Sequence, residues 1–340
     1  MGKAMQAILK AITAVKPSVE ESIHEQRLLE ETLGALELGD TRVRVERTHT
    51  RLKDGTKIQL LVFTPRKDIV LPLKNNTKEE LDGTLVFIHG GGWVAGNVEL
   101  YTDSCKETAH HLNRRIISID YPLAPEYKFP RALNVCYEVY TQLMQGHIIK
   151  EIDPDKVCLF GDSAGGNLCA ALSLMARKKR KVPVHQQILL YPALSNCYDM
   201  HSPFESVHTN GTDYYLTAED MQEYLKLYVA NKKDLRSPYL APLLADDYSD
   251  MPRTLIMSAE YCPLRDEDNA YALLLKEAGN DVMAYEILDA IHGYFTNPYA
   301  QQLVLPTVHI MKHFLNGTEL KPTKKLSWQP LIDETLAAKA

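Results

Sequence analysis

The chain has 340 residues, of which 45% are hydrophobic and 24% charged, and its formal net charge at pH 7 is −6. These values are typical of a globular protein with a sizeable core, and the length suits one α/β domain with an added lid. The acidic balance argues against binding to nucleic acid, which requires a basic surface.

The N-terminus and the cysteines narrow the class of protein further. Met1–Lys16 has apolar and basic residues at helical spacing but no continuous apolar segment, so we expect no secretory signal. No stretch of the chain is long and apolar enough to cross a bilayer. The cysteines lack paired spacing, which predicts free thiols in a reducing compartment and no zinc site. We therefore expect a cytoplasmic protein with no metal ion and no stable membrane anchor. The six cysteines are Cys105, Cys136, Cys158, Cys169, Cys197 and Cys262.

The N-terminal part of the chain changes from a helical period to a strand period. Residues 1–40 are rich in Ala, Leu, Glu and Lys, which predicts helix. Apolar residues then alternate with polar ones in Arg42–Arg47 and in Lys57–Phe63, and Asp54-Gly55 between these segments is a hairpin signal. The sequence thus predicts two antiparallel strands after the helical region.

The middle and the end of the chain alternate between short apolar runs and helical patterns. Unbroken apolar strands predict a parallel sheet that is covered on both faces, and the alternation predicts an α/β fold with a mostly parallel, doubly wound sheet. The main apolar runs are Leu85–Ile88, Ile116–Ile119, Val157–Phe160, Ile188–Leu190 and Leu255–Met257. The helical patterns are Cys105–Leu112, Ala132–Leu143, Asn167–Ala176 and Asn269–Ala278.

Residues 196–236 interrupt this alternation. They are rich in Tyr, His, Asp and Asn, and Thr217–Val229 has the pattern of an amphipathic helix capped by Thr217. We expect this segment to be an insertion above the sheet.

The strongest chemical signal is the run Gly161-Asp162-Ser163-Ala164-Gly165-Gly166. It lies between a predicted strand and a predicted helix, which is the setting of a nucleophile elbow. Side chains at Gly161 or Gly165 would collide with neighbouring backbone in so tight a turn. The turn places the hydroxyl of Ser163 at a helix N-terminus, where backbone amides favour developing negative charge. Ser163 is therefore the predicted nucleophile.

A second signal is the run His89-Gly90-Gly91-Gly92-Trp93, directly after a predicted strand. Consecutive glycines leave amide groups open to a ligand, and loops of this type supply oxyanion-hole donors in esterases and lipases. We predict that the amides of Gly91, Gly92 and Ala164 form an oxyanion hole, with His89 as a structural hydrogen-bonding residue. A phosphate loop is not expected, because no Lys follows and no helix begins there.

A third signal is His292-Gly293, which follows the predicted strand Ala284–Leu288. This position late in the chain is where an α/β-hydrolase places its base, after the nucleophile and the acid. We predict that His292 accepts the proton of Ser163.

Together these motifs resemble the hormone-sensitive lipase family of α/β-hydrolase carboxylesterases. The resemblance covers roughly residues 40–315 and also includes Asp120–Glu126, Phe129-Pro130 and Ser237–Leu243. It implies hydrolysis of small esters, short acyl chains and no cofactor, and it allows a homodimer. By this resemblance the chain is organised into cap segments 1–40 and 196–236, core segments 41–195 and 237–320, and a tail at 321–340.

The acid of the resembling family is replaced in this chain. The family places an orienting Asp at the start of a segment that here is Cys262-Pro263-Leu264-Arg265-Asp266-Glu267. A thiol is a poor acceptor and is mostly neutral near pH 7, because its ordinary pKa is about 8.5. Loss of the orienting carboxylate can lower kcat by on the order of 10⁴.

Three interpretations of this replacement follow. A nearby carboxylate could substitute, with Asp266 as the tentative acid and Glu260 and Asp289 as weaker candidates. The enzyme could instead run as a Ser163–His292 dyad with low activity. It could also be a small-molecule binding protein that has lost the chemistry, although intact Ser163 and His292 argue against this. A nucleophilic role of the cysteine is not expected, since the elbow and the oxyanion hole converge on Ser163.

The predicted activity is acyl transfer from a small ester, with an amidase or deacetylase activity at the same site as the alternative. Aromatic residues of the insertion are expected either to wall an acyl pocket or to pack within the cap. They are Tyr198, Phe204, Tyr214 and Tyr215.

Overall fold

The computed structural model describes residues 1–34, 42–66, 81–297 and 300–318. Its centre is an eight-stranded sheet with the order β1-β2-β4-β3-β5-β6-β7-β8. β2 pairs antiparallel with β1 and with β4, and every other pair is parallel. The strands are β1 (Val43–Arg51), β2 (Lys57–Pro65), β3 (Thr84–Ile88), β4 (Arg115–Ile119), β5 (Val157–Asp162), β6 (Gln186–Leu190), β7 (Arg253–Tyr261) and β8 (Val282–Ile291). The mostly parallel α/β sheet predicted from the apolar runs is confirmed.

The first two strands form the predicted hairpin. β1 and β2 pair from Val43↔Pro65 to Arg51↔Lys57. Gly55 in the turn has φ +86°, a conformation that glycine adopts without steric cost.

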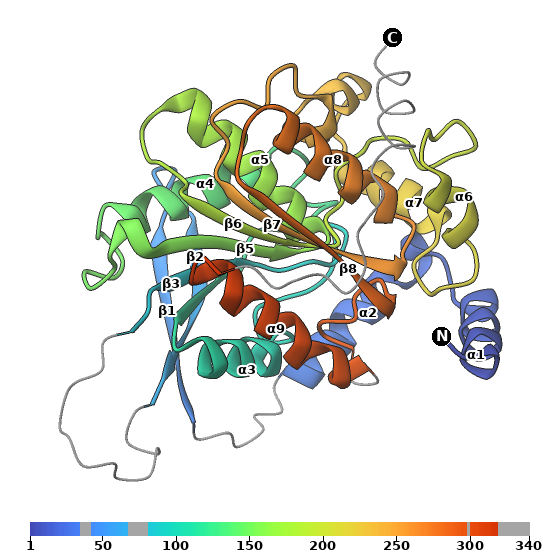
Figure 1. Cartoon of the computed structure of the whole chain (residues 1–340), viewed down its shortest axis with the longest axis horizontal. Coiled ribbons are helices and arrows are strands. Elements are labelled where there is room, and N and C mark those ends of the chain that lie inside the picture. Colours follow the sequence, from blue (N-terminus) through green and yellow to red (C-terminus); the bar gives the residue numbers. More distant parts are fainter. Residues whose placement is uncertain (35–41, 67–80, 298–299, 319–340) are drawn as a thin grey trace.

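Helices cover both faces of the sheet. α4, α5 and α8 lie on one face, while α3 and α9 lie side by side on the other (Figure 1). α5 begins at Ala164, three residues earlier than its apolar pattern indicates, because the elbow leads directly into the helix. α9 contains Pro306 and was not predicted as a helix. These helices are α3 (Thr102–Leu112), α4 (Arg131–Met144), α5 (Ala164–Lys179), α8 (Arg265–Glu277) and α9 (Gln301–Leu315). Short 3₁₀ helices occur at Pro154–Lys156, Lys232–Arg236 and Pro242–Leu244.

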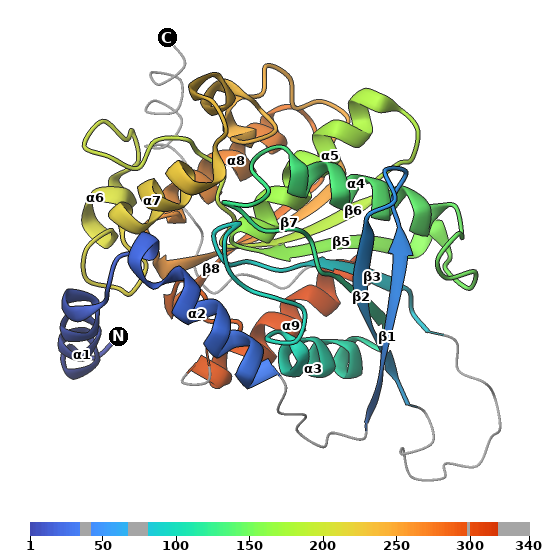
Figure 2. The same ribbon diagram turned by 180° about the vertical axis from the view of Figure 1, so that it is seen from behind.

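Four further helices gather beyond the end of the sheet at which β5 to β8 terminate (Figures 1 and 2). They are α1 (Lys3–Val15), α2 (Val19–Gly34), α6 (Glu205–Asn210) and α7 (Ala218–Tyr228). Thr217 caps α7 in a capping box with Asp220, as the sequence predicts. An ion pair of 2.5 Å between Lys226 and Glu20 joins α7 to α2. The N-terminal helices and the 196–236 insertion therefore meet above the carboxyl ends of the strands, where α/β sheets bind ligands.

Several sequence expectations concern the molecule as a whole. All six cysteines are free thiols. None of the helices in the described residues combines the length and the apolarity that crossing a bilayer requires. Within the same residues, no group of His, Cys, Asp and Glu side chains is arranged to hold a metal ion. The proposed tail 321–340 and residues 35–40 of the first segment lie outside the described residues.

Candidate active site

Ser163 sits on a strained turn between β5 and α5. Its backbone has φ 53° and ψ −122°, which an L-residue adopts only where the surrounding structure enforces it. A Cβ atom at Gly161 would lie 2.5 Å from the carbonyl oxygen of Gly165, and one at Gly165 would lie 2.0 Å from that of Ile88. Both glycines are therefore required by close backbone packing, as the sequence predicts.

His292 lies on the loop after β8 and faces the serine. Its Nε2 is 2.8 Å from Oγ of Ser163, within the reach of proton transfer. The edge of the imidazole packs against the ring of Tyr191, with centroids 4.8 Å apart. Burial, together with the positive charge of Lys16, lowers the pKa of His292 to about 3. The imidazole is consequently neutral at pH 7 and free to accept a proton.

The other ring nitrogen of His292 contacts the thiol of Cys262. Sγ lies 3.1 Å from Nδ1, and the amide of Leu264 donates a hydrogen bond of 3.3 Å to the same sulfur. Burial raises the pKa of Cys262 well above its ordinary value, and the charge of Asp268 acts in the same direction. A hydrogen bond from Nδ1–H to this sulfur leaves Nε2 unprotonated, which is the tautomer that a general base requires, whereas a bond from the thiol hydrogen to Nδ1 would place the proton on Nε2.

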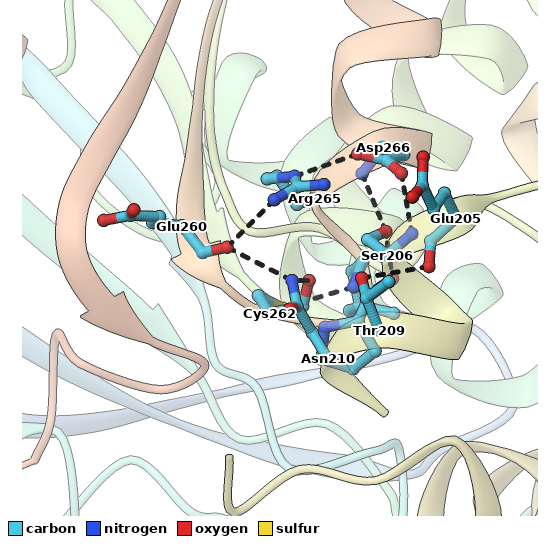
Figure 3. A network of polar contacts seen from close by, with 10 residues as sticks. Glu205, Ser206, Thr209, Asn210, Glu260, Cys262, Arg265 and Asp266 are labelled. Carbon is cyan, nitrogen blue, oxygen red and sulfur yellow. Dashed lines mark hydrogen bonds and ion pairs between the residues drawn. The ribbon is translucent and has the colours of Figure 1, made fainter. Parts of the chain in front are cut away.

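The loop that carries Cys262 is fixed by α6 (Figure 3). The side-chain amide of Asn210 donates hydrogen bonds of 3.2 Å to the carbonyl oxygens of Glu260 and Cys262. The hydroxyl of Ser206 donates to the carbonyl of Pro263 at 2.7 Å. The sulfur is thus held in place by the insertion as well as by the core.

The contacts do not support Asp266 as a substitute acid. Its carboxylate accepts hydrogen bonds from the backbone amide of Ser206 at 2.7 Å and from Nε of Arg265 at 2.9 Å (Figure 3). α8 begins at Arg265, and Asp266 in its first turn bonds to Ser206 of α6, whereas Cys262 contacts His292.

The two weaker candidates are also engaged elsewhere. The carboxylate of Asp289 contacts the terminal amine of Met1, and its backbone amide donates a hydrogen bond of 2.7 Å to Glu260. Among the described residues, Cys262 is the group that contacts Nδ1 of His292.

The glycine loop after β3 lies beside the serine. Gly91, Gly92 and Ala164 line the same cavity as Ser163 and His292. Among the described residues, no hydrogen bond uses the amides of Gly91 and Gly92. Ala164 is the first residue of α5, and the amides of a first helical turn have no partner within the helix. The three residues predicted to supply donors therefore line the cavity that also holds Ser163.

His89 and Asp162 hold the glycine loop in place through hydrogen bonds and a ring contact. Nδ1 of His89 contacts the carbonyl oxygen of Gly90 at 2.8 Å, and its ring stacks on Tyr121. Asp162 accepts hydrogen bonds from the amide of Gly90 at 2.8 Å and from the hydroxyl of Tyr101 at 3.0 Å. His89 is thus buried against the loop that it belongs to, and the part played by Asp162 was not anticipated.

The cavity above these groups has a volume of ≈ 560 Å³. Of the four aromatic residues predicted to wall it or to pack in the cap, only Tyr215 lines it. Tyr198 is instead buried and bonded to Glu267 through a hydrogen bond of 3.0 Å. Tyr224 of α7 also lines the cavity, and a Cβ atom at Gly92 would lie 2.3 Å from its ring. The sequence did not indicate this residue. Its position in an amphipathic helix could not distinguish a cavity residue from an ordinary packing residue.

A hydroxyl bonded to a neutral imidazole, beside amides without other partners, is what acyl transfer requires. The fold and this chemistry define the chain as a serine hydrolase. A family model described as alpha/beta hydrolase fold matches residues 85–296, and the chain belongs to this family. The motif resemblance to hormone-sensitive lipase-like carboxylesterases is confirmed by relatives and structures named as esterases.

Similar proteins include an arylesterase of Saccharolobus solfataricus, 33% identical over 70% of this chain and 77% of that protein. The carboxylic ester hydrolase LipN of Mycobacterium tuberculosis is 35% identical over 62% of this chain, which spans only 56% of LipN. Among solved structures, an esterase of Pyrobaculum calidifontis has a TM-score of 0.74 and 31% identity, covering 92% of this chain and 98% of that one.

Proposed function

We propose that Ser163, His292 and Cys262 form the catalytic unit of an esterase that acts on small carboxylic esters. The observation that carries this proposal is the line of contacts from Oγ of Ser163 to Nε2 of His292 and from Nδ1 to Sγ of Cys262. Relatives named arylesterase and ethyl acetate hydrolase support a small-ester substrate. The family resemblance adds a short acyl chain to this proposal.

The proposed reaction proceeds through an acyl-enzyme. Oγ of Ser163 attacks the ester carbonyl while its proton moves to Nε2 of His292, and the amides of Gly91, Gly92 and Ala164 hold the oxyanion. The bond from carbon to the alcohol oxygen breaks, and the alcohol leaves with the proton from Nε2. Water then attacks the acyl group with His292 again as base, which releases the acid and restores the serine.

The neutral thiol favours esters with a good leaving group. A carboxylate would stabilise the imidazolium that forms during attack, and the thiol of Cys262 supplies no such charge. A phenolate leaves without prior protonation, whereas an alkoxide or an amine needs the proton of the imidazolium. We therefore propose aryl esters as the preferred class, with alkyl esters slower and anilides slowest. An arylacetamide deacetylase of Rattus norvegicus is 29% identical, so the amide reaction has its own arm in the test.

The test compares p-nitrophenyl acetate, ethyl acetate and p-nitroacetanilide on four proteins: the natural chain, Cys262→Asp, Cys262→Ala and Ser163→Ala. We expect the natural chain to turn over the aryl ester fastest and Ser163→Ala to lose turnover. We expect Cys262→Asp to raise kcat by at least about tenfold, since an orienting carboxylate can increase kcat by up to ~10⁴-fold. Cys262→Ala should lower kcat because it removes the sulfur that orients the ring.

Three results would contradict the proposal. Full turnover by Ser163→Ala would exclude the serine as nucleophile. Equal kcat for Cys262→Ala and the natural chain would exclude a role of the sulfur. Faster turnover of the anilide than of the aryl ester would favour the amidase alternative.

We also propose that residues 1–40 and 196–236 act together as a cap and that the enzyme works in the reducing cytoplasm, where its six free thiols persist. The family resemblance adds a homodimer as the proposed assembly. Light scattering on the purified chain measures this directly: a mass near twice 38.5 kDa supports it, and a mass near 38.5 kDa excludes it.

A further inference from the structure

The oxyanion loop, residues 89–96, is bonded to a helix from the other end of the chain. One carboxylate oxygen of Glu30 in α2 accepts a hydrogen bond of 2.8 Å from the amide of Gly96. Its other oxygen accepts a hydrogen bond of 2.9 Å from the side chain of Gln26. The side chain of Glu30 is buried, with 8% exposure. A buried carboxylate that accepts a backbone N–H forms a charge-assisted bond, which is shorter and stronger than a neutral one.

A second residue of α2 contacts the same loop. Nε of Arg27 donates a hydrogen bond of 2.7 Å to the carbonyl oxygen of Val94. Its guanidinium also contacts the carbonyl of Ala124 and the carboxylate of Glu126. Successive turns of α2 therefore hold Val94 and Gly96, while the core holds Gly90 through Asp162.

The bonds of α2 reach the predicted oxyanion donors through the turn itself. The carbonyl oxygen of Gly91 accepts hydrogen bonds from the amides of Val94 at 3.1 Å and of Ala95 at 2.8 Å. Gly96 packs so closely on the loop that a Cβ atom there would lie 2.6 Å from the carbonyl oxygen of Gly90. A shift of Gly96 would consequently displace Gly90 and Gly91.

The direction of amide dipoles at an oxyanion hole must be held closely. Productive sites are positioned within about 0.5 Å, and a misplacement of about 1 Å can cost on the order of 10² in rate. We propose that Glu30 is a positioning residue of the oxyanion hole and that α2 serves as a catalytic support as well as a wall of the cavity. This inference rests on the proposed esterase function.

The same helix also lines the cavity. Gln26 lines the cavity and bonds to Glu30, which in turn bonds to Gly96. A substrate group that contacts Gln26 is therefore two hydrogen bonds away from the loop that stabilises its oxyanion. Binding at the α2 wall and transition-state stabilisation are coupled through Glu30.

The test uses three variants of the full-length chain. Glu30→Leu removes the acceptor at similar volume, whereas Glu30→Gln keeps an amide oxygen that can accept the bond from Gly96. Glu21→Gln is the matched control, because Glu21 is exposed on the first turn of α2 and contacts neither the loop nor the cavity. The readouts are kcat per active site, counted by the nitrophenol burst, KM, and Ki for an aryl trifluoromethyl ketone, whose serine adduct places an oxyanion in the hole.

We expect Glu30→Leu to lower kcat per active site by about 10-fold to 100-fold and to raise Ki by a similar factor, with little change in KM, because the lost interaction exists only in the transition state. Glu30→Gln should stay within about 3-fold of the natural chain, and Glu21→Gln should match it. If Glu30→Leu does not fold, Glu30→Asp replaces it, since the shorter side chain withdraws the acceptor and keeps the charge.

A wild-type kcat per active site and Ki in Glu30→Leu, or in Glu30→Asp where it is the variant used, would overturn the inference. The inference would also be overturned if the activity fell only in proportion to the fraction of folded protein. Failure of the proposed function is a separate result, because the natural chain itself would then show neither burst nor turnover.

Discussion

At the scale of single residues, Cys262 separates two tasks that one carboxylate usually performs. Its sulfur contacts Nδ1 of His292 at 3.1 Å and so holds the orientation of the ring. Because the thiol is neutral, it does not stabilise the positive charge that the ring acquires during attack. The structure therefore keeps the geometry of a serine hydrolase and gives up part of its electrostatic stabilisation.

This separation predicts an unusual pH profile. Burial and the nearby charge of Lys16 lower the pKa of His292 to about 3, and only the neutral ring acts as base. In the natural chain, kcat/KM should therefore stay constant from neutral to acidic pH and fall only as the pH approaches that pKa. In Cys262→Asp the carboxylate favours the charged ring, so the pKa rises and the acidic limb moves to higher pH. Identical limbs in the two proteins, measured with p-nitrophenyl acetate, would contradict this account.

Asp266 provides a second test at this scale. Its carboxylate bonds to Ser206 and Arg265, so Asp266→Asn should lower the free energy of unfolding by about 1–3 kcal/mol and keep most of kcat per active site. Urea unfolding and burst-corrected kinetics measure the two quantities. An abolished kcat in a fully folded variant would restore Asp266 as the catalytic acid.

The helix α8 shows how one element combines opposing electrostatic effects. Its first turn buries three consecutive carboxyl groups, on Asp266, Glu267 and Asp268. A helix N-terminus favours negative charge, but loss of solvent disfavours it. Glu267 accepts hydrogen bonds from the amide of Leu194 and the hydroxyl of Tyr198, and burial raises its pKa to about 8. For Asp268, neither oxygen has a hydrogen-bond partner within the described residues, and burial raises its pKa.

Asp268 should therefore destabilise the fold increasingly as the pH rises. In the unfolded chain the pKa of Asp268 is about 3.9. Below this pH the carboxyl group holds its proton in both the folded and the unfolded state, and above it only the unfolded state releases the proton readily. Stability is thus lost as the pH rises toward the raised folded pKa. As the pH rises from 4 to 8, we expect the free energy of unfolding of Asp268→Asn to increase by about 1–3 kcal/mol relative to that of the natural chain. Unfolding free energies from urea titrations at both pH values check the sign, and a difference that does not change with pH would contradict it.

At the scale of elements, local patterns predicted the structure where neighbours in sequence also interact in space. The elbow around Ser163, the hairpin at Gly55 and the cap at Thr217 depend on residues within a few positions of one another. The start of α5 and the presence of α9 were missed. The elbow glycines hide the first turn of α5, and Pro306 interrupts the helical pattern of α9.

At the scale of the whole molecule, the site is assembled from segments that are far apart in the chain. The amide of Gly96 is bonded to Glu30, and the loop of Cys262 is bonded to Asn210 of the insertion. No periodicity or motif indicates such pairs, because the side chains involved are ordinary polar residues on helices. The strand-to-loop contexts of Ser163 and His292 predict that the two side chains meet, and the structure places them in contact, but the partner of Nδ1 had to be read from three-dimensional contacts.

The whole arrangement converges on one claim, that the hydroxyl of Ser163 is the activated nucleophile although a thiol stands in the acid position. The most direct measurement is reaction of the natural chain with a fluorophosphonate, followed by mass spectrometry of its peptides. The account predicts a single phosphonyl adduct on Ser163, which is absent from Ser163→Ala and forms faster in Cys262→Asp. An unmodified chain, or an adduct on Cys262, would contradict it.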